Sequence, residues 1–235
     1  MNLPRSLTNL FGEPEDWQKD KTGGSDAQVF YLPSKNAWLK YGSHHIQQEA
    51  EILRFLQGKV LVPELLFYEE VDGLQYMVTS TLIGNNFIHK EVLARPEKLI
   101  DLLAKAVRSL HSLDIHACPF NRRLEVKLNS WTFPDDVYAE LKQNPPDEDL
   151  VFTHGDACLP NFFCQVWRYT GCIDLAEAGI ADRWQDLSLS LWSLQYNLGT
   201  IKWGKPFLEV YGIQPDYQKI EYYLKLNMMD TLDVI

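Results

Sequence analysis

Apolar and polar residues alternate along several short segments in the first third of the chain, a pattern typical of β-strands with one buried face. Between two of these segments, residues 44–58 repeat apolar positions at helical spacing and predict a helix. The strand-like segments are AQVFYL (27–32), AWLKYG (37–42) and LQYMVTST (74–81). This third of the chain is therefore expected to be a small sheet with one helix.

The apolar stripe of that helix contains Ile46, Leu53 and Leu56, and Glu49 falls on the same stripe. A carboxylate that faces a core needs a cationic partner. Lys40, on the preceding predicted strand, is the natural candidate. The alternative is that Glu49 lies at the edge of the stripe and points to water.

Helical periodicity dominates the rest of the chain. From Glu97 to Leu113 apolar residues recur at intervals of three and four, and Pro96 stands just before them, where proline favours a helix start. A shorter helix is expected within residues 132–149, ending before a pair of prolines. A strand is then expected to begin at Leu150.

The change of pattern predicts an α+β protein with two lobes. Residues 1–83 are expected to form a β-rich N-terminal lobe that ends in a hinge, and residues 84–235 a mostly helical C-terminal lobe. A length of 235 residues and a hydrophobic fraction of 46% are sufficient for substantial cores in both.

The overall charge argues against two classes of partner. The chain has 22 Lys and Arg against 32 Asp and Glu, a net charge of -10. Nucleic acids and anionic membrane surfaces would be repelled, so neither is expected as a partner. Taken alone, the charge is better explained by a solvated acidic surface that keeps the protein soluble, and the alternative is a cationic substrate.

Location follows from what the sequence lacks. No apolar run approaches the roughly 18 residues of a membrane span, and the first residues, MNLPRSLTNLFGEPEDW, lack the apolar core of a signal peptide. The four cysteines form no C-x-x-C pair and are expected to be reduced packing residues. A cytoplasmic location is predicted.

Three polar residues directly follow an apolar strand in the stretch HGDACLPN (154–161). Asp156 and Asn161 are five positions apart, the D-x-x-x-x-N spacing of a kinase catalytic loop, in which the aspartate accepts a hydroxyl proton and the asparagine holds magnesium. Both residue types also cap ordinary turns, and a lone D-x-x-x-x-N is more often such a turn.

The residues after Asn161 strengthen the catalytic interpretation. FFCQVW and GCIDLA flank RYTG (168–171), which predicts a β-hairpin that turns at RYTG and returns Asp174 beside the loop. Phosphoryl transfer needs hard oxygen ligands for magnesium and one carboxylate near the attacking hydroxyl. We therefore expect Asp156 to be the base, and Asn161 and Asp174 to be the metal ligands.

The run from HGD through the hairpin to GIADRWQDL resembles the aminoglycoside phosphotransferases, most closely the 3'-phosphotransferases that include the neomycin and kanamycin kinases. The resemblance extends to DKTGGSDAQVFYL, VPELLFYE and YGIQPDYQKIEYY, so it covers nearly the whole chain. It implies a protein-kinase-like two-lobed fold, ATP and Mg2+ as cofactors, and phosphorylation of a cationic aminoglycoside, which gives antibiotic resistance.

The resemblance also implies where the nucleotide binds. Lys40 with Glu49 would orient the phosphates, and Ser25, in the glycine-rich turn TGGS, would reach a phosphate oxygen. Trp38 shares a strand face with Lys40 and would stack on adenine. Main-chain groups near Ser80 and Leu82, in MVTSTLIG, would read the adenine edge.

Three departures from the family pattern affect the acceptor side. Glu177 stands where the family usually has arginine; it could slow transfer or bind a cationic substrate. The segment before Leu150 is shorter than in the family and leaves Asp135, Asp136 and Glu140 as candidate acceptor contacts. The chain ends in LNMMDTLDVI in place of an acidic terminus.

These departures keep two alternatives open. The protein could be a kinase of another small hydroxylated metabolite or antibiotic, or a nucleotide-binding relative that has lost catalysis. Other polar residues receive structural roles: His154 is expected to brace the loop, Asp186 to cap a helix and support the loop, and His111 and His116 to flank a helix end.

Overall fold

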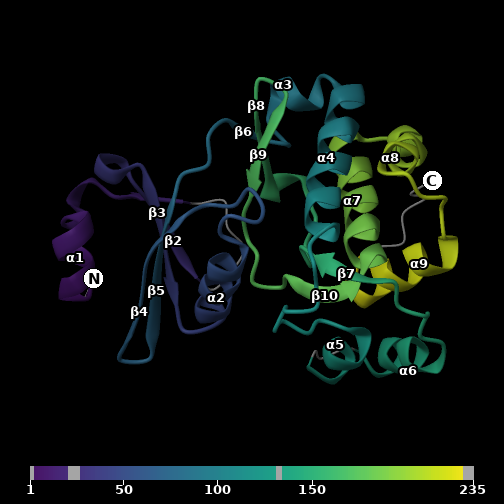
Figure 1. Cartoon of the computed structure of the whole chain (residues 1–235), viewed down its shortest axis with the longest axis horizontal. Helices are drawn as coiled ribbons and strands as arrows, with labels where there is room; N and C mark the ends of the chain where they lie inside the picture. Colours follow the sequence, from purple (N-terminus) through teal and green to yellow (C-terminus); the bar gives the residue numbers. More distant parts are fainter. Residues whose placement is uncertain (1–2, 21–26, 131–133, 230–235) are drawn as a thin grey trace. The chain divides into compact units, whose positions relative to one another are not determined.

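The computed structural model describes residues 3–20, 27–130 and 134–229. The chain divides into two compact units, residues 1–82 and 83–235, one residue before the predicted boundary. The first is rich in strands and the second in helices (Figure 1). In the described part of the chain, no helix is long and apolar enough to cross a membrane.

An antiparallel sheet forms the first unit, in the strand order β1-β2-β3-β5-β4 within its described residues. One face packs against α1 (Arg5–Phe11) around a core that includes Leu7, Leu39 and Val78. Helix α2 (Ile46–Leu56) lies on the other side. The strands are β1 (Gln18–Lys19), β2 (Gln28–Leu32), β3 (Ala37–Gly42), β4 (Leu65–Val71) and β5 (Leu74–Ser80).

The predicted alternation holds in β3. Ala37 and Leu39 are fully buried, whereas Trp38 and Lys40 are half-buried on the opposite face. On α2 the predicted stripe is buried, and it includes Glu49. The alternative that Glu49 faces water is therefore wrong.

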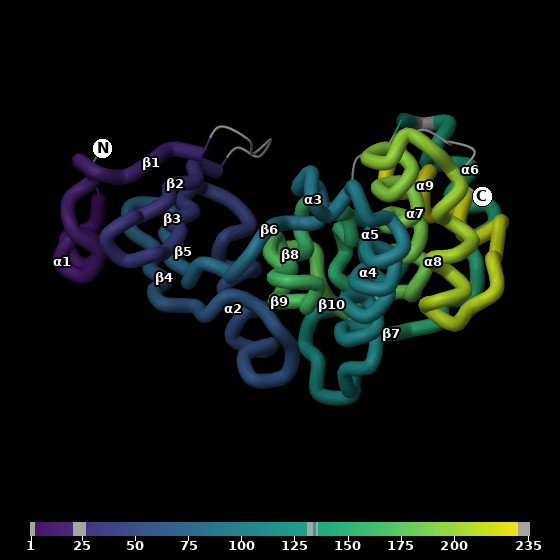
Figure 2. The backbone as a smooth tube through the Cα atoms, turned by 90° about the horizontal axis from the view of Figure 1, so that it is seen from above, coloured from purple at the N-terminus to yellow at the C-terminus, as the bar shows by residue number. Residues whose placement is uncertain are grey.

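Two long helices form the centre of the second unit. The helix predicted from Glu97 is α4 (Pro96–His111), and it packs with α7 (Arg183–Leu198). Figures 1 and 2 show α8 and α9 beside this pair. The remaining helices are α3 (Lys90–Leu93), α5 (Leu124–Ser130), α6 (Asp135–Gln143), α8 (Gly204–Tyr211) and α9 (Tyr217–Leu226).

Two small sheets complete this unit. Strand β7 (Leu150–Thr153) pairs with β10 (Gly179–Asp182), and β8 (Phe162–Gln165) pairs with both β6 (Asn85–Asn86) and β9 (Arg168–Cys172). Gly84, before β6, has a φ of 100°, and a Cβ there would lie 2.1 Å from the carbonyl oxygen of Cys164. Only glycine fits this close approach.

The hairpin after the loop is present, but its turn was predicted in the wrong place. It turns at Val166 and Trp167, and RYTG lies within β9. Both turn residues have positive φ, 48° and 60°, as a two-residue hairpin turn requires. Bulky residues rarely adopt this conformation, so the sequence pattern pointed to the next polar stretch.

Candidate active site

The loop after β7 brings Asp156 and Asn161 together. The Asn161 side-chain amide donates to the Asp156 main-chain carbonyl at 2.9 Å and to its Oδ2 at 3.0 Å. Asp156 is half-buried and Asn161 is 7% exposed. Because the NH2 group faces Asp156, Oδ1 of Asn161 is the atom that can take a cation.

Asp174 lies at the same end of the β8–β9 hairpin as Asn161. The Ile173 amide donates to the Asn161 carbonyl oxygen at 2.9 Å. Asp174 is the next residue after Ile173, so its backbone lies close to that of Asn161. Asp174 is exposed and has a φ of 58°. This backbone conformation occurs at functional sites as well as in turns such as Val166–Trp167.

The oxygen atoms of Asn161 and Asp174 suit a magnesium ion that is shared with a nucleotide, and not a metal site built from protein ligands alone. No cluster of three or more His, Cys, Asp or Glu side chains suited to a metal occurs within the described residues. Mg2+ is commonly bound by one or two carboxylates, with waters and substrate phosphates as its other ligands. One amide oxygen and one exposed carboxylate therefore suit a magnesium ion that arrives with a nucleotide.

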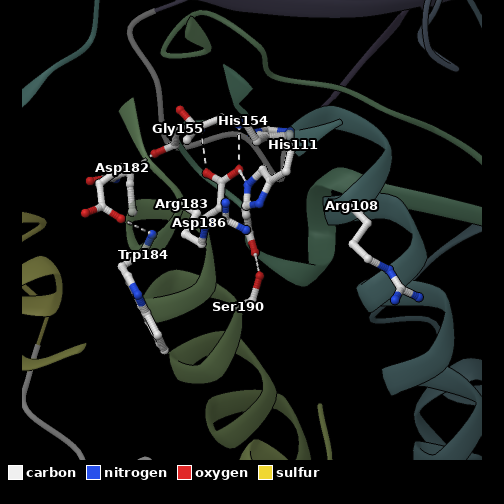
Figure 3. A network of polar contacts seen from close by, with 12 residues as sticks. Arg108, His111, His154, Gly155, Asp182, Arg183, Trp184, Asp186 and Ser190 are labelled. Atoms are coloured by element: carbon white, nitrogen blue, oxygen red, sulfur yellow. Dashed lines mark hydrogen bonds and ion pairs between the residues drawn. The ribbon is translucent and has the colours of Figure 1, made fainter. Parts of the chain in front are cut away.

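Asp186 of α7 holds the start of this loop (Figure 3). It accepts hydrogen bonds from the main-chain amides of His154 at 2.7 Å and Gly155 at 2.9 Å, and from Nε2 of His111 at 3.0 Å. Burial acts to raise the pKa of Asp186, but the His111 bond and the other contacts outweigh it and hold that pKa below its usual value. The carboxylate is therefore a buried anion that fixes two loop amides.

The predicted roles of two residues need correction. The side chain that caps α7 is Asp182, which accepts from the Trp184 amide at 2.8 Å, so of the roles assigned to Asp186 only loop support is right. His111 does more than flank a helix end, because its buried ring also lies 2.8 Å from the Tyr211 hydroxyl. His154 braces the loop as expected, with Nδ1 accepting from the Asp156 amide at 3.3 Å.

Two serines of α7 extend the support along the loop. Ser190 donates to the Ala157 carbonyl, and Ser193 accepts from the Leu159 amide, both at 2.9 Å. With Asp186 they are spaced at i, i+4 and i+7, which places them on one helix face. This polar stripe in DLSLSLWSL is the sequence signal that could have revealed the whole supporting surface.

The loop of residues 154–161 lies tightly against the segment that contains Glu177. Gly155 has a φ of 86°, and a Cβ there would lie 2.2 Å from the Glu177 carbonyl oxygen. The Glu177 side chain is half-buried. Any side chain at position 155 would push these two segments apart.

Lys127 of α5 is a buried cation close to the candidate site that sequence reasoning missed. It is 8% exposed, and its Nζ donates to Oδ1 of Asn227 at 3.0 Å. Burial lowers the pKa of Lys127 to about 8, although the negative charges of Glu177, Asp186 and Asp156 act to raise it. In the sequence, a lysine on a short helix looks like an ordinary surface residue.

In the first unit, the predicted Lys40–Glu49 ion pair is present, with a distance of 2.8 Å between Nζ and Oε2. The Trp38 ring lies 5.0 Å from that of Tyr31. The Ser80 amide donates to the Glu64 carbonyl within the sheet, so it is not available for a ligand. Ser25 lies outside the described residues.

The predicted acceptor contacts have a mixed outcome. Glu140 forms an ion pair with Lys225, whereas Asp136 is exposed on α6. Of Asp135 only the helical backbone is described, and residues 230–235 of the C-terminus lie outside the described residues. Glu177 lies near Lys127, so part of its charge is already compensated within the chain.

A proton-accepting carboxylate beside oxygen ligands for a cation suits phosphoryl transfer, and comparison with known families gives the same class. Residues 40–223 match the phosphotransferase enzyme family, and the chain belongs to it. Within this family it is an aminoglycoside 3'-phosphotransferase-like enzyme. An aminoglycoside 3'-phosphotransferase of Niallia circulans is 34% identical over 96% of this chain and 97% of that protein, and one of Enterococcus faecalis is 30% identical over 89% and 91%.

Solved structures confirm the predicted kinase-like two-lobed fold. The aminoglycoside phosphotransferase APH(3'')-Id of Streptomyces rimosus has a TM-score of 0.79 at 24% identity, covering 94% of this chain and 96% of that one. An aminoglycoside-3'-phosphotransferase of type VIII gives the same four values. The Streptomyces enzyme has also been solved in complex with ADP and streptomycin.

Proposed function

We propose that this protein transfers the γ-phosphoryl group of ATP to a hydroxyl of a cationic aminoglycoside, at the 3' position, and so confers resistance to the antibiotic. The observation that carries the proposal is the Asp156–Asn161 pair with Asp174 beside it. The curated relatives are named for this reaction, and the Streptomyces complex with ADP and streptomycin adds support.

In the proposed reaction Asp156 accepts the proton of the acceptor hydroxyl. The hydroxyl oxygen forms its bond to the γ-phosphorus as the bond between that phosphorus and the bridging oxygen breaks, and ADP leaves with that oxygen. The amide of Asn161 keeps the Asp156 carboxylate oriented through its bond to Oδ2. Asp156 thus acts as a general base whose position is fixed before the acceptor arrives.

Asn161 and Asp174 would hold Mg2+ through Oδ1 and a carboxylate oxygen. The ion, when bound, neutralises charge on the phosphates that develops during transfer. Asn161 and Ile173 are joined by a main-chain hydrogen bond. That bond keeps the backbone segments that carry the two ligands side by side.

Lys40 would bind the α- and β-phosphates, with Glu49 holding its ammonium in place. Glu49 is buried, so it limits the rotamers that Lys40 can adopt. Trp38, on the same face of β3, would stack on the adenine ring. Ser25 would contact a phosphate, and of the two hinge positions Leu82 is the better candidate for the adenine edge, because the Ser80 amide is already used.

A coupled assay for ADP release tests the proposal. Purified protein is incubated with ATP and Mg2+ and a panel of kanamycin- and neomycin-type compounds, and the product is mapped by NMR to locate the phosphorylated hydroxyl. Asp156→Ala serves as the inactive control. Phosphorylation at the 3' hydroxyl is the expected result.

Other outcomes identify the alternatives. Turnover with neutral hydroxylated compounds but with no aminoglycoside would replace the antibiotic acceptor with another small metabolite. Stabilisation by ATP only when Mg2+ is present, without turnover on any acceptor, would identify a nucleotide-binding protein that has lost catalysis.

A further inference from the structure

A chain of three side chains, with Lys127 and Gln185 buried and Asn227 half-buried, connects α5 to the catalytic loop. Nζ of Lys127 donates to Oδ1 of Asn227 at 3.0 Å. The same oxygen accepts from Nε2 of Gln185 at 2.8 Å, and that nitrogen also donates to the Gly155 carbonyl at 3.0 Å. Three elements, α5, the end of α9 and α7, therefore meet behind the residue that precedes Asp156.

The charges of three carboxylates and one guanidinium act on the Lys127 ammonium. Asp156 lies in the loop of residues 154–161, Glu177 in the segment before β10, and Asp186 on α7, and all three favour the charged form of Lys127. Arg122, just before α5, is a positive charge that acts against it. Arg122 itself donates from Nη2 to the Ala176 carbonyl at 2.9 Å. Lys127 and Arg122 are thus both linked to the two segments that carry the Asp156 and Glu177 carboxylates.

The fold retains this ammonium at a cost in stability. Burial lowers the pKa of Lys127 to about 8, so desolvation outweighs the attraction of the three carboxylates. A neutral residue of the same length would be favoured if packing were the only requirement. Perturbed, buried charges of this kind are typical of functional sites.

We propose that Lys127 is a positioning residue for phosphoryl transfer, which acts through Asn227 and Gln185 on the Gly155 carbonyl and through its charge on Asp156 and Glu177. This inference rests on the proposed function. The positive charge of Lys127 offsets the loop carboxylates when the anionic nucleotide approaches. The hydrogen-bond chain keeps the peptide before Asp156 in one orientation. The competing explanation is a purely structural tie between α5 and α9.

Lys127→Met tests the proposal because methionine keeps most of the length and removes the charge. Lys127→Arg restores a charge, and Lys105→Met, at an exposed position of α4, is the matched control. For each variant we would measure kcat, the KM for ATP, the thermal unfolding midpoint, and amide hydrogen exchange across residues 154–161. The pH profile of kcat is recorded for the wild type and Lys127→Arg.

We expect Lys127→Met to lose about tenfold in kcat, the effect of one hydrogen bond to a charged group, with little change in the KM for ATP. Its unfolding midpoint at pH 7 stays equal to or above that of the wild type, and loop amides exchange faster. Lys127→Arg recovers part of kcat. In the wild type kcat falls as the pH rises through 8, and in Lys127→Arg this fall moves to higher pH.

Unchanged kcat and loop exchange in Lys127→Met would overturn the proposal. A loss of kcat that accompanies an equal loss of stability, with no rescue by arginine, would show that the role is structural only. If the wild type phosphorylates no aminoglycoside, the proposed function fails. The exchange measurement, made with ATP and Mg2+ but no acceptor, still decides whether Lys127 positions the loop.

Discussion

At the scale of single residues, Asp156 and Asp174 are both aspartates, but their surroundings differ. Asp156 is half-buried and bonded to Asn161, whereas Asp174 is exposed with a positive φ. We expect Asp156→Ala to lower kcat by about a hundredfold or more, because general-base catalysis and positioning are both lost, while ATP affinity changes little.

Asp174→Ala is expected to abolish Mg2+-dependent ATP binding, because the carboxylate would link the cation to the site.

Kinetics and isothermal titration with and without Mg2+ would separate the two variants, and Asp101→Ala, at an exposed position on α4, is the control. Retention of most activity in Asp156→Ala would exclude it as the base. Unchanged Mg2+-dependent affinity in Asp174→Ala would remove it from the metal site.

At the scale of elements, α7 supports the loop of residues 154–161 through Asp186, Ser190 and Ser193. Asp186→Asn keeps the shape but replaces one acceptor oxygen with a donor, which would face either the Gly155 amide or the His154 amide together with His111. We expect it to lower the free energy of unfolding of the C-terminal unit by about 3 kcal/mol and to lower kcat.

Ser190→Ala removes one neutral hydrogen bond and should lower the free energy of unfolding by about 1 kcal/mol.

The pH dependence distinguishes Asp186 from the serine. The pKa of Asp186 lies below its unfolded value, so its stabilisation is complete above the unfolded pKa and is lost as the pH falls through the folded pKa. Urea titrations of the wild type and Asp186→Asn should therefore differ most near neutral pH and converge in acid. A difference that is constant with pH would show that the Asp186 charge is not responsible.

At the scale of the whole molecule, the net charge of -10 should attract a cationic acceptor and, because salt screens exposed charges, lose that attraction at high ionic strength. We expect the acceptor KM to rise by about 3-fold or more when the salt concentration is raised from about 0.05 M to about 0.5 M. Glu177→Gln should raise the KM by a smaller factor, because Lys127 already compensates part of that charge.

The measurement is a set of acceptor titrations at several salt concentrations, at saturating ATP and constant free Mg2+. An acceptor KM that is independent of salt would mean that carboxylates do not provide the main binding energy for the acceptor.

Local patterns were sufficient for much of the fold and part of the site. Alternation in β3 placed Trp38 and Lys40 on one face, and the stripe of α2 turned Glu49 toward the core, because side-chain direction follows strand and helix periods. Asp156 and Asn161 are close in sequence, so a short loop brings them together. The hairpin turn at Val166 and Trp167 was missed, because those residue types rarely adopt positive φ.

Residues distant in sequence could not be joined in this way. His111 and Asp186 are 75 positions apart, and Lys127 and Asn227 are 100 apart. Nothing in their local sequence records the contact, which exists only because α4, α5, α7 and the end of α9 pack around one loop. The periodic sequence specifies which side of each helix or strand is buried, but the partner of a buried polar group depends on how the elements pack together, since desolvation selects only arrangements in which such groups are paired.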